Sequence, residues 1–288
     1  MSFLTVHHST VYRYGAPVSL GEHRMLFRPR ESHDLRLIRT NLIITPRPAV
    51  LRWLHDPFDN SVAVATFEGT TTELRFDSTV TLEHFENSVP EYPLEEYARR
   101  YPFSYSDEDF SNLGCALDHH NGDRNVSQWA LQFLDASDTT GTMKILRSMT
   151  AGIREQFKYT RRSEKGVQTP AETLQSRQGS CRDFAVLMIE ATRSLGVAAR
   201  FVSGYIFAPN SSGLAGGGAT HAWMQAYLPG AGWIDFDPTN SIIGNRNLIR
   251  VAVAWAPEQA LPLWGTYAGA AEDFLGMDVA VTVSEAAG

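Results

Sequence analysis

The first part of the chain alternates between apolar and polar positions. Stretches such as 35–44 and 62–67 show this period of two, and Pro, Gly and Asn residues separate them. A period of two places one face of a strand against a core and the other toward solvent. Several short strands of this kind, joined by turns, are typical of an all-β sandwich. We therefore predict an all-β sandwich over residues 1–85.

Helical spacing replaces this alternation in the second half of the chain. Apolar residues from Met143 to Phe157 recur every three or four positions, which predicts a helix that begins near Thr139. A second amphipathic helix is predicted from about Cys181 to Leu195. Gly196 follows it and favours the left-handed conformation in which helices commonly end.

The chain after this second helix has the pattern of an antiparallel sheet. A glycine-rich loop over 209–218 separates its first two strands, and a turn over 229–232 joins the next two as a hairpin. The strands are predicted at 197–206, 221–228, 233–237, 248–255 and 277–283. The fold class is therefore α+β, with the β-sandwich first, a linker and helical segment over 86–136, and a core of helices packed on an antiparallel sheet over 137–288.

Cys181 occupies the first position of the second predicted helix. Ser180 precedes it as the N-cap and Asp183 follows three residues later, which is the spacing of a capping box. The free N–H groups at a helix start and the positive end of its dipole favour a thiolate over a thiol. Arg182 adds a positive charge, and Gly179 leaves room for the turn that aims the sulfur. These features predict a reactive thiol at Cys181, whereas Cys115, without them, is predicted to be a small buried apolar residue.

An imidazole and a carboxylate follow on the predicted hairpin, at His221 and Asp237. Side chains alternate along strands, so His221 and Asp237 share a face only if the sequence numbers of two residues paired across the hairpin have an even sum. A simple four-residue turn between Leu228 and Trp233 gives an odd number. We therefore predict a three-residue loop or a bulge, which sets His221 opposite or nearly opposite Asp237. Asp235 lies on the same face, so this argument does not choose between the two acids.

A thiol, an imidazole and a carboxylate are the parts of a thiol acyl-transfer enzyme. His221 would accept the proton of Cys181 and later return it to the leaving amine, while the acid would fix the tautomer of the imidazole. The backbone N–H of Cys181 is the natural donor to the oxyanion. Gln175 and Gln178 are candidates for the second donor, and both are equally compatible with solvated loop positions.

Four segments around these residues resemble the transglutaminase-like superfamily in its bacterial branch. They are GSCRDFA at 179–185, LGVAARFVSGY at 195–205, HAW at 221–223 and GWIDFDPT at 232–239. The resemblance implies a papain-like α+β core with a Cys, His, Asp triad at Cys181, His221 and Asp237. That family places its acid four residues after the tryptophan of the Gly-Trp motif, which favours Asp237 over Asp235.

The resemblance extends to the region before the core. Residues 8–14, 17–18, 28–30 and 56–60 look like the N-terminal domain that precedes this core in bacterial proteins. The usual Phe-Gly-Asn appears here as Phe58-Asp59-Asn60, and Asp tolerates turn geometry almost as well as Gly. The resemblance therefore covers most of the chain.

Two classes of function fit these observations. The first is an enzyme that forms a thioester on Cys181 and passes the acyl group to water, as a peptidase or amidase, or to an amine, as a transglutaminase. The second is a non-catalytic module that binds a protein partner on the same scaffold. The complete Cys181, His221 and Asp237 set favours the enzyme, with peptide or protein amides as substrate.

Composition narrows the remaining possibilities. The net charge is −7 with scattered basic residues, which argues against nucleic-acid binding. No leading apolar stretch resembles a signal peptide and no apolar run is long enough to span a bilayer, so we expect a soluble cytoplasmic protein without a membrane partner. Two cysteines form no disulfide framework. The adjacent pairs at 7–8 and 119–120 do not share a face, so the histidines predict no metal site, and we expect no cofactor.

Overall fold

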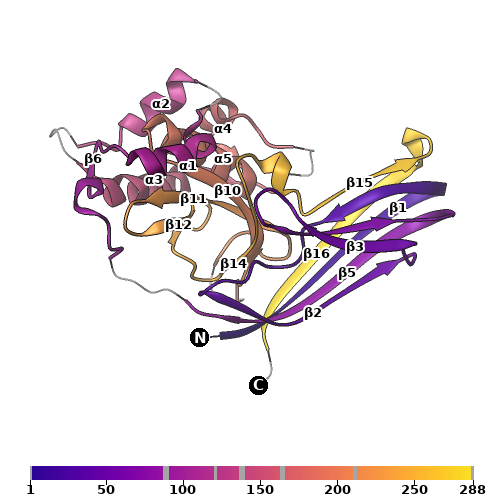
Figure 1. Cartoon of the computed structure of the whole chain (residues 1–288). Helices are drawn as coiled ribbons and strands as arrows, with labels where there is room; N and C mark the ends of the chain where they lie inside the picture. The colour runs from indigo at the N-terminus through magenta and orange to yellow at the C-terminus, as the bar shows by residue number, and fades with distance from the viewer. Residues whose placement is uncertain are drawn as a thin grey trace.

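The computed structural model describes residues 2–86, 91–119, 122–135, 140–162, 166–209 and 213–286. Two large antiparallel sheets organise this part of the chain. Figure 1 shows the helices gathered around the second sheet, while the long strands of the first extend away from them. The predicted α+β class is confirmed.

The N-terminal sheet is built around one long strand, β1. The first half of β1 pairs with β5 and β16, and its second half with β4 and β15. This antiparallel sheet forms a half-barrel. Its strands are β1 (Ser2–Met25), β2 (Leu35–Thr45), β3 (Val50–His55), β4 (Ser61–Thr66), β5 (Thr70–His84), β15 (Leu263–Ala268) and β16 (Phe274–Glu285).

One strand prediction is wrong. Residues 277–283 were expected to complete the core sheet, but they lie in β16, which pairs with β1 from Leu4 opposite Glu285 to Tyr14 opposite Phe274. Figure 1 shows the yellow C-terminal strands beside indigo β1. A period of two shows that a strand has a buried face, but it does not show which sheet supplies the partner. The range predicted for the core, 137–288, thus ends in two strands of the N-terminal sheet.

The core sheet has the order β13-β12-β11-β10-β14, so the predicted strand at 248–255 does join it, beside β10. One face packs against α5 through Ala222, Met224 and Ala226 of β11, all in the main apolar cluster. The core strands are β10 (Ala199–Ile206), β11 (His221–Leu228), β12 (Gly232–Asp237), β13 (Ile242–Ile243) and β14 (Leu248–Ala254). The opposite face of β11 carries His221, Trp223 and Gln225.

Five α-helices lie in the described part of the chain, and α5 is the one that contacts the core sheet most extensively. The predicted start of α3 near Thr139 lies outside the described residues. The helices are α1 (Asp107–Leu117), α2 (Arg124–Leu131), α3 (Thr142–Gln156), α4 (Pro170–Ser176) and α5 (Cys181–Ser194). The short elements are η1 (Glu96–Ala98), β6 (Arg100–Tyr101), β7 (Thr140–Gly141), β8 (Lys158–Tyr159), β9 (Gln178–Gly179), η2 (Pro257–Ala260) and η3 (Ala271–Asp273).

Buried polar contacts join the two sheets. The side-chain amide of Asn60, which is fully buried, donates to the carbonyl of Val253 and accepts from its N–H, at 2.8 and 2.9 Å. Asp59, which replaces the usual glycine of this motif, has a φ of +61°. His8 of β1 lies 2.9 Å from the hydroxyl of Tyr205 on β10. The half-barrel is therefore fixed to β10 and β14, next to the strand that carries His221.

Candidate active site

The N-terminus of α5 has the structure that its sequence predicts. Cys181 is the first helical residue, Ser180 has an extended backbone, and Gly196 ends the helix region with a φ of +73°. The Asp183 carboxylate accepts hydrogen bonds from the backbone N–H and the hydroxyl of Ser180, at 2.7 and 2.8 Å. The acid half of the predicted capping box is thus present, and it holds the backbone directly before Cys181.

Asp183 also connects this helix start to the segment before α4. Its second oxygen accepts from the Arg162 guanidinium at 2.8 Å and from the backbone N–H of Gln168 at 2.7 Å. Burial would raise the pKa of Asp183, but these hydrogen bonds outweigh it and lower the pKa. A Cβ at Gly179 would lie 2.9 Å from the Cβ of Asp183, so a side chain there would displace the acid.

The β11–β12 hairpin has the predicted parity. Leu228 pairs with Gly232 and Met224 with Phe236, so Pro229-Gly230-Ala231 form a three-residue loop, which confirms the prediction. This register places Asp237 diagonal to His221 on the same face. The Nε2 atom of His221 lies 2.8 Å from Oδ2 of Asp237, and both side chains are fully buried.

Asp235 has a different set of partners. Its Oδ1 accepts from the indole N–H of Trp223 at 2.6 Å and from the side-chain amide of Gln225 at 2.9 Å. The ring of Trp223 in turn stacks on that of His221, with centroids 5.9 Å apart. The geometry therefore pairs His221 with Asp237 and leaves Asp235 to hold Trp223 against the imidazole.

Cys181 also interacts with this imidazole. Cys181 is 6% exposed and belongs to the main apolar cluster, and it is also among the groups that raise the pKa of His221. Burial alone would lower this pKa, but Asp237 and Cys181 outweigh burial and raise it to about 10. The Nδ1 atom of His221 is buried and makes no hydrogen bond of normal geometry within the described residues. The structure thus brings Cys181, His221 and Asp237 together, with Nδ1 free to exchange a proton.

Two further residues hold Asp237, and sequence analysis missed both. Oδ1 of Asp237 accepts from the backbone N–H of Thr239 at 2.9 Å, and Oδ2 accepts from the side-chain amide of Asn240 at 2.8 Å. The position of both directly after the Asp-Pro turn was the available signal. The carboxylate therefore has three donors, which fix its orientation toward His221.

Tyr159 was also missed. It lies in β8, which pairs with β9 in parallel so that Tyr159 is opposite Gly179, two residues before Cys181. Burial raises the pKa of Tyr159, and the charges of Cys181 and Asp237 raise it further, which places the phenol among the site residues. Its hydroxyl makes no hydrogen bond within the described part of the chain.

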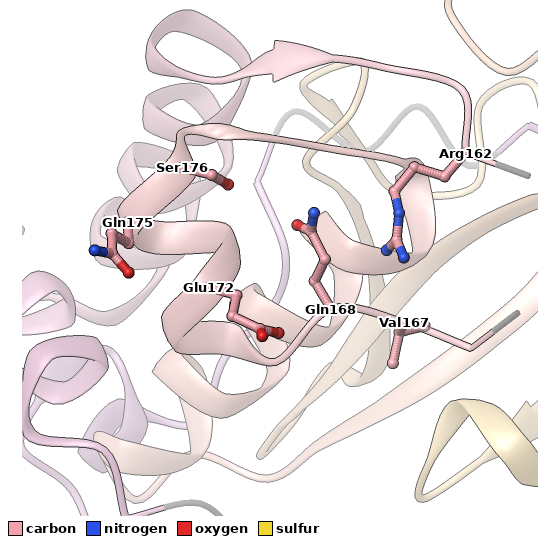
Figure 2. A pocket seen from close by; sticks show the side chains of 6 residues that line it. All are labelled: Arg162, Val167, Gln168, Glu172, Gln175 and Ser176. Atoms are coloured by element: carbon pink, nitrogen blue, oxygen red, sulfur yellow. The ribbon is translucent and has the colours of Figure 1, made fainter. Parts of the chain in front are cut away.

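The two glutamines proposed as oxyanion donors lie elsewhere. Gln178 is exposed in β9, and Gln175 is exposed on α4. Gln175 lines a groove of about 460 Å³. Figure 2 shows that Gln168 lies between α4 and Arg162 in this groove. Neither glutamine hydrogen-bonds to Cys181 or His221 among the described residues. The groove is lined by Arg162, Val167, Gln168, Glu172, Gln175 and Ser176.

Other sequence predictions concern residues away from the site. Cys115 was predicted to be buried but is exposed, because α1 turns Leu113 and Ala116 inward instead. His7 contacts Thr79 at the surface, while His8 is buried, and His120 lies outside the described residues. The described residues contain no cluster of three or more His, Cys, Asp or Glu side chains placed to hold a metal ion. No helix in the described ranges combines the length and hydropathy needed to cross a bilayer.

Family models match two regions of the chain. Residues 4–83 match the bacterial transglutaminase-like N-terminal region, and residues 128–238 match the transglutaminase-like superfamily core. The second match contains Cys181, His221 and Asp237. The chain is a bacterial transglutaminase-like N-terminal region joined to a transglutaminase-like core.

Individual proteins and one solved structure are also similar to this chain. The uncharacterized protein Rv2569c of Mycobacterium tuberculosis is 27% identical over 262 residues, which is 85% of this chain and 81% of the relative. The uncharacterized protein ML0607 of Mycobacterium leprae is 35% identical over 114 residues, 38% of this chain and 40% of its own. A crystal structure of a candidate cysteine protease from Cytophaga hutchinsonii has a TM-score of 0.71 at 18% identity and covers 99% of this chain and 92% of its own. That likeness shows the shared fold.

Proposed function

We propose that this transglutaminase-like protein is a thiol-dependent acyl-transfer enzyme that cleaves peptide or protein amide bonds, as a cysteine peptidase or amidase. The observation that carries the proposal is the buried imidazole of His221, which is hydrogen-bonded to Asp237 through Nε2, interacts with Cys181 and has its other nitrogen without a hydrogen-bond partner among the described residues. A raised pKa at His221 favours the imidazolium at neutral pH, and its positive charge would stabilise negative charge on the sulfur of the Cys181 and His221 pair.

The chemistry follows from this pair. Nδ1 of His221 takes the proton of the Cys181 thiol, and the sulfur attacks the amide carbon while the backbone N–H of Cys181 donates to the oxyanion. The C–N bond then breaks, and His221 returns the proton to the leaving amine. Water next gives a proton to His221 and attacks the thioester, which releases the acid and restores the thiol. An amine in place of water would give transfer.

Site-resolved alkylation tests the activated thiol. Iodoacetamide labelling of Cys181 should proceed well below pH 8.5 in the wild type, and its midpoint should move toward 8.5 in His221→Ala. Exposed Cys115 labels in the same tube and serves as the internal control. Labelling of wild-type Cys181 only above its ordinary pKa would contradict the proposal and favour a non-catalytic binding module.

A second assay separates hydrolysis from transfer. A glutamine peptide is incubated with and without an excess of a primary amine. Release of ammonia without incorporation of the amine would support the hydrolase. Incorporation of the amine would instead identify a protein-glutamine transglutaminase, which uses the same three residues.

A further inference from the structure

Asn240, just after β12, has a side-chain amide with unusually complete hydrogen bonding. Its Nδ2 donates to Oδ2 of Asp237 at 2.8 Å and to the carbonyl of Ala215 at 3.1 Å. Its Oδ1 accepts from the backbone N–H of Ala215 at 2.7 Å. Both N–H donors of the amide and its carbonyl oxygen are therefore used.

The chemistry of the partners fixes which end of the amide is which. A carboxylate and a carbonyl can only accept, so both require the Nδ2 end. The backbone N–H of Ala215 can only donate, so it requires Oδ1. An aspartate in place of Asn240 would keep the shape and the contact to the N–H of Ala215, but it would turn an oxygen toward Asp237.

The segment that Asn240 holds lies against the catalytic imidazole. Gly216 follows Ala215 and has a φ of +93°, and a Cβ on it would lie 2.5 Å from Nδ1 of His221. Further along the segment, the carbonyl of Gly218 accepts from the backbone N–H of Val281 in β16. The described part of the glycine-rich loop is thus fixed at one end by Asn240 and at the other by the half-barrel.

We propose that Asn240 is a positioning residue of this site, which orients Asp237 for His221 and holds Gly216 over the same imidazole. The inference rests on the proposed function of Cys181. One amide links the acid to the loop, so a change at Asn240 should disturb the turnover step more than substrate binding.

The test compares Asn240→Asp and Asn240→Ala with the wild type. We expect kcat for amide hydrolysis to fall at least tenfold in both, with a smaller change in KM. The midpoint pH for iodoacetamide labelling of Cys181 should rise, and more in Asn240→Asp, because an added carboxylate opposes the thiolate. Asn41, which is exposed on β2, provides the matched control, and Asn41→Asp should behave as the wild type.

The outcomes separate this inference from the proposed function. A wild-type Cys181 without enhanced labelling defeats the proposed function. If wild-type Cys181 is activated and the kcat of Asn240→Asp is within twofold of the wild-type kcat, the role of Asn240 is overturned but the proposed function is not. A fall in kcat without a shift in the labelling midpoint also overturns it, because that pattern reports general loosening of the fold. Thermal unfolding identifies a variant that fails to fold. If Asn240→Ala fails to fold, the isosteric variant Asn240→Asp still decides the test.

Discussion

At the residue scale, we propose that the phenol of Tyr159 supplies the second donor of the oxyanion site. The reaction requires a donor in addition to the N–H of Cys181. The parallel pairing of β8 with β9 places Tyr159 beside the backbone that leads into Cys181, and the hydroxyl has no partner within the described residues. The exposed Gln175 and Gln178 lack this placement.

Tyr159→Phe keeps the ring and removes only the hydroxyl. We expect kcat to fall by roughly ten- to a hundredfold with a smaller change in KM, because an oxyanion donor acts mainly in the transition state. Steady-state amide hydrolysis measures this effect. Tyr97→Phe, at an exposed tyrosine of η1, is the control. Equal kcat values for Tyr159→Phe and the wild type would exclude the hydroxyl from the reaction.

The sequence alone indicated Cys181, His221 and Asp237 but not the residues that hold them. Each of the three lies at the edge of an element with a clear local pattern. Asn240 depends on Ala215 in a loop without periodicity, and Tyr159 depends on a two-residue parallel strand pair. Contacts of this kind are set by tertiary structure, so residue spacing does not reveal them.

At the scale of elements, Asp183 determines how α5 begins. Its carboxylate accepts from Ser180, Arg162 and Gln168 in a buried position. Asp183→Asn keeps the shape but replaces one acceptor oxygen with a donor that faces donors. We expect the free energy of unfolding at pH 7 to fall by about 2–4 kcal/mol in urea denaturation.

The pH dependence of this loss gives a second check. The pKa of Asp183 is lowered in the folded chain, so its contribution is present above the unfolded pKa near 3.9 and is lost as the pH falls below it. The difference between wild type and Asp183→Asn should therefore shrink in acid. Asp107→Asn, in the exposed first turn of α1, is the matched control and should cost less than about 1 kcal/mol. A similar cost at both positions would contradict the role of Asp183.

Local sequence patterns predicted where strands and helices occur better than they predicted which strands pair with each other. The predicted strand at 221–228 coincides with β11, and the hairpin parity followed from the face that His221 and Asp237 had to share. Strand β16 was predicted as a strand but assigned to the wrong sheet. Its pairing with β1 joins the two ends of the chain, and no local signal encodes a contact at such separation.

At the scale of the whole molecule, the ion pair between His221 and Asp237 should make the free energy of unfolding decrease as the pH rises into the alkaline range. The pKa of His221 is raised from 6.5 to about 10, so the folded chain keeps a proton that the unfolded chain loses. This contribution is present in full below about pH 6.5 and is lost as the pH rises toward 10. Asp237→Asn removes the charge that raises this pKa. The free energy of unfolding should therefore decline less steeply between pH 7 and 10 in the variant, and equal slopes in urea denaturation would refute the coupling.

The contact of His8 between the two sheets should have the opposite effect: it should make the free energy of unfolding decrease as the pH falls into the acid range. Burial lowers the pKa of His8 to about 4, so the unfolded chain binds a proton below pH 6.5 that the folded chain does not. The contribution of neutral His8 is present above about pH 6.5 and is lost as the pH falls toward 4, by about 3 kcal/mol at most. His8→Gln removes this titration, so the free energy of unfolding should fall less steeply with decreasing pH in the variant. The decrease that remains reflects His23 and His84, whose pKa values are also lowered. His7→Gln is the control: it changes an exposed neighbour that faces away from the core sheet, so the free energy of unfolding should depend on pH as in the wild type. If it fell as steeply with decreasing pH in His8→Gln as in the wild type, proton uptake at the sheet contact would not set acid stability.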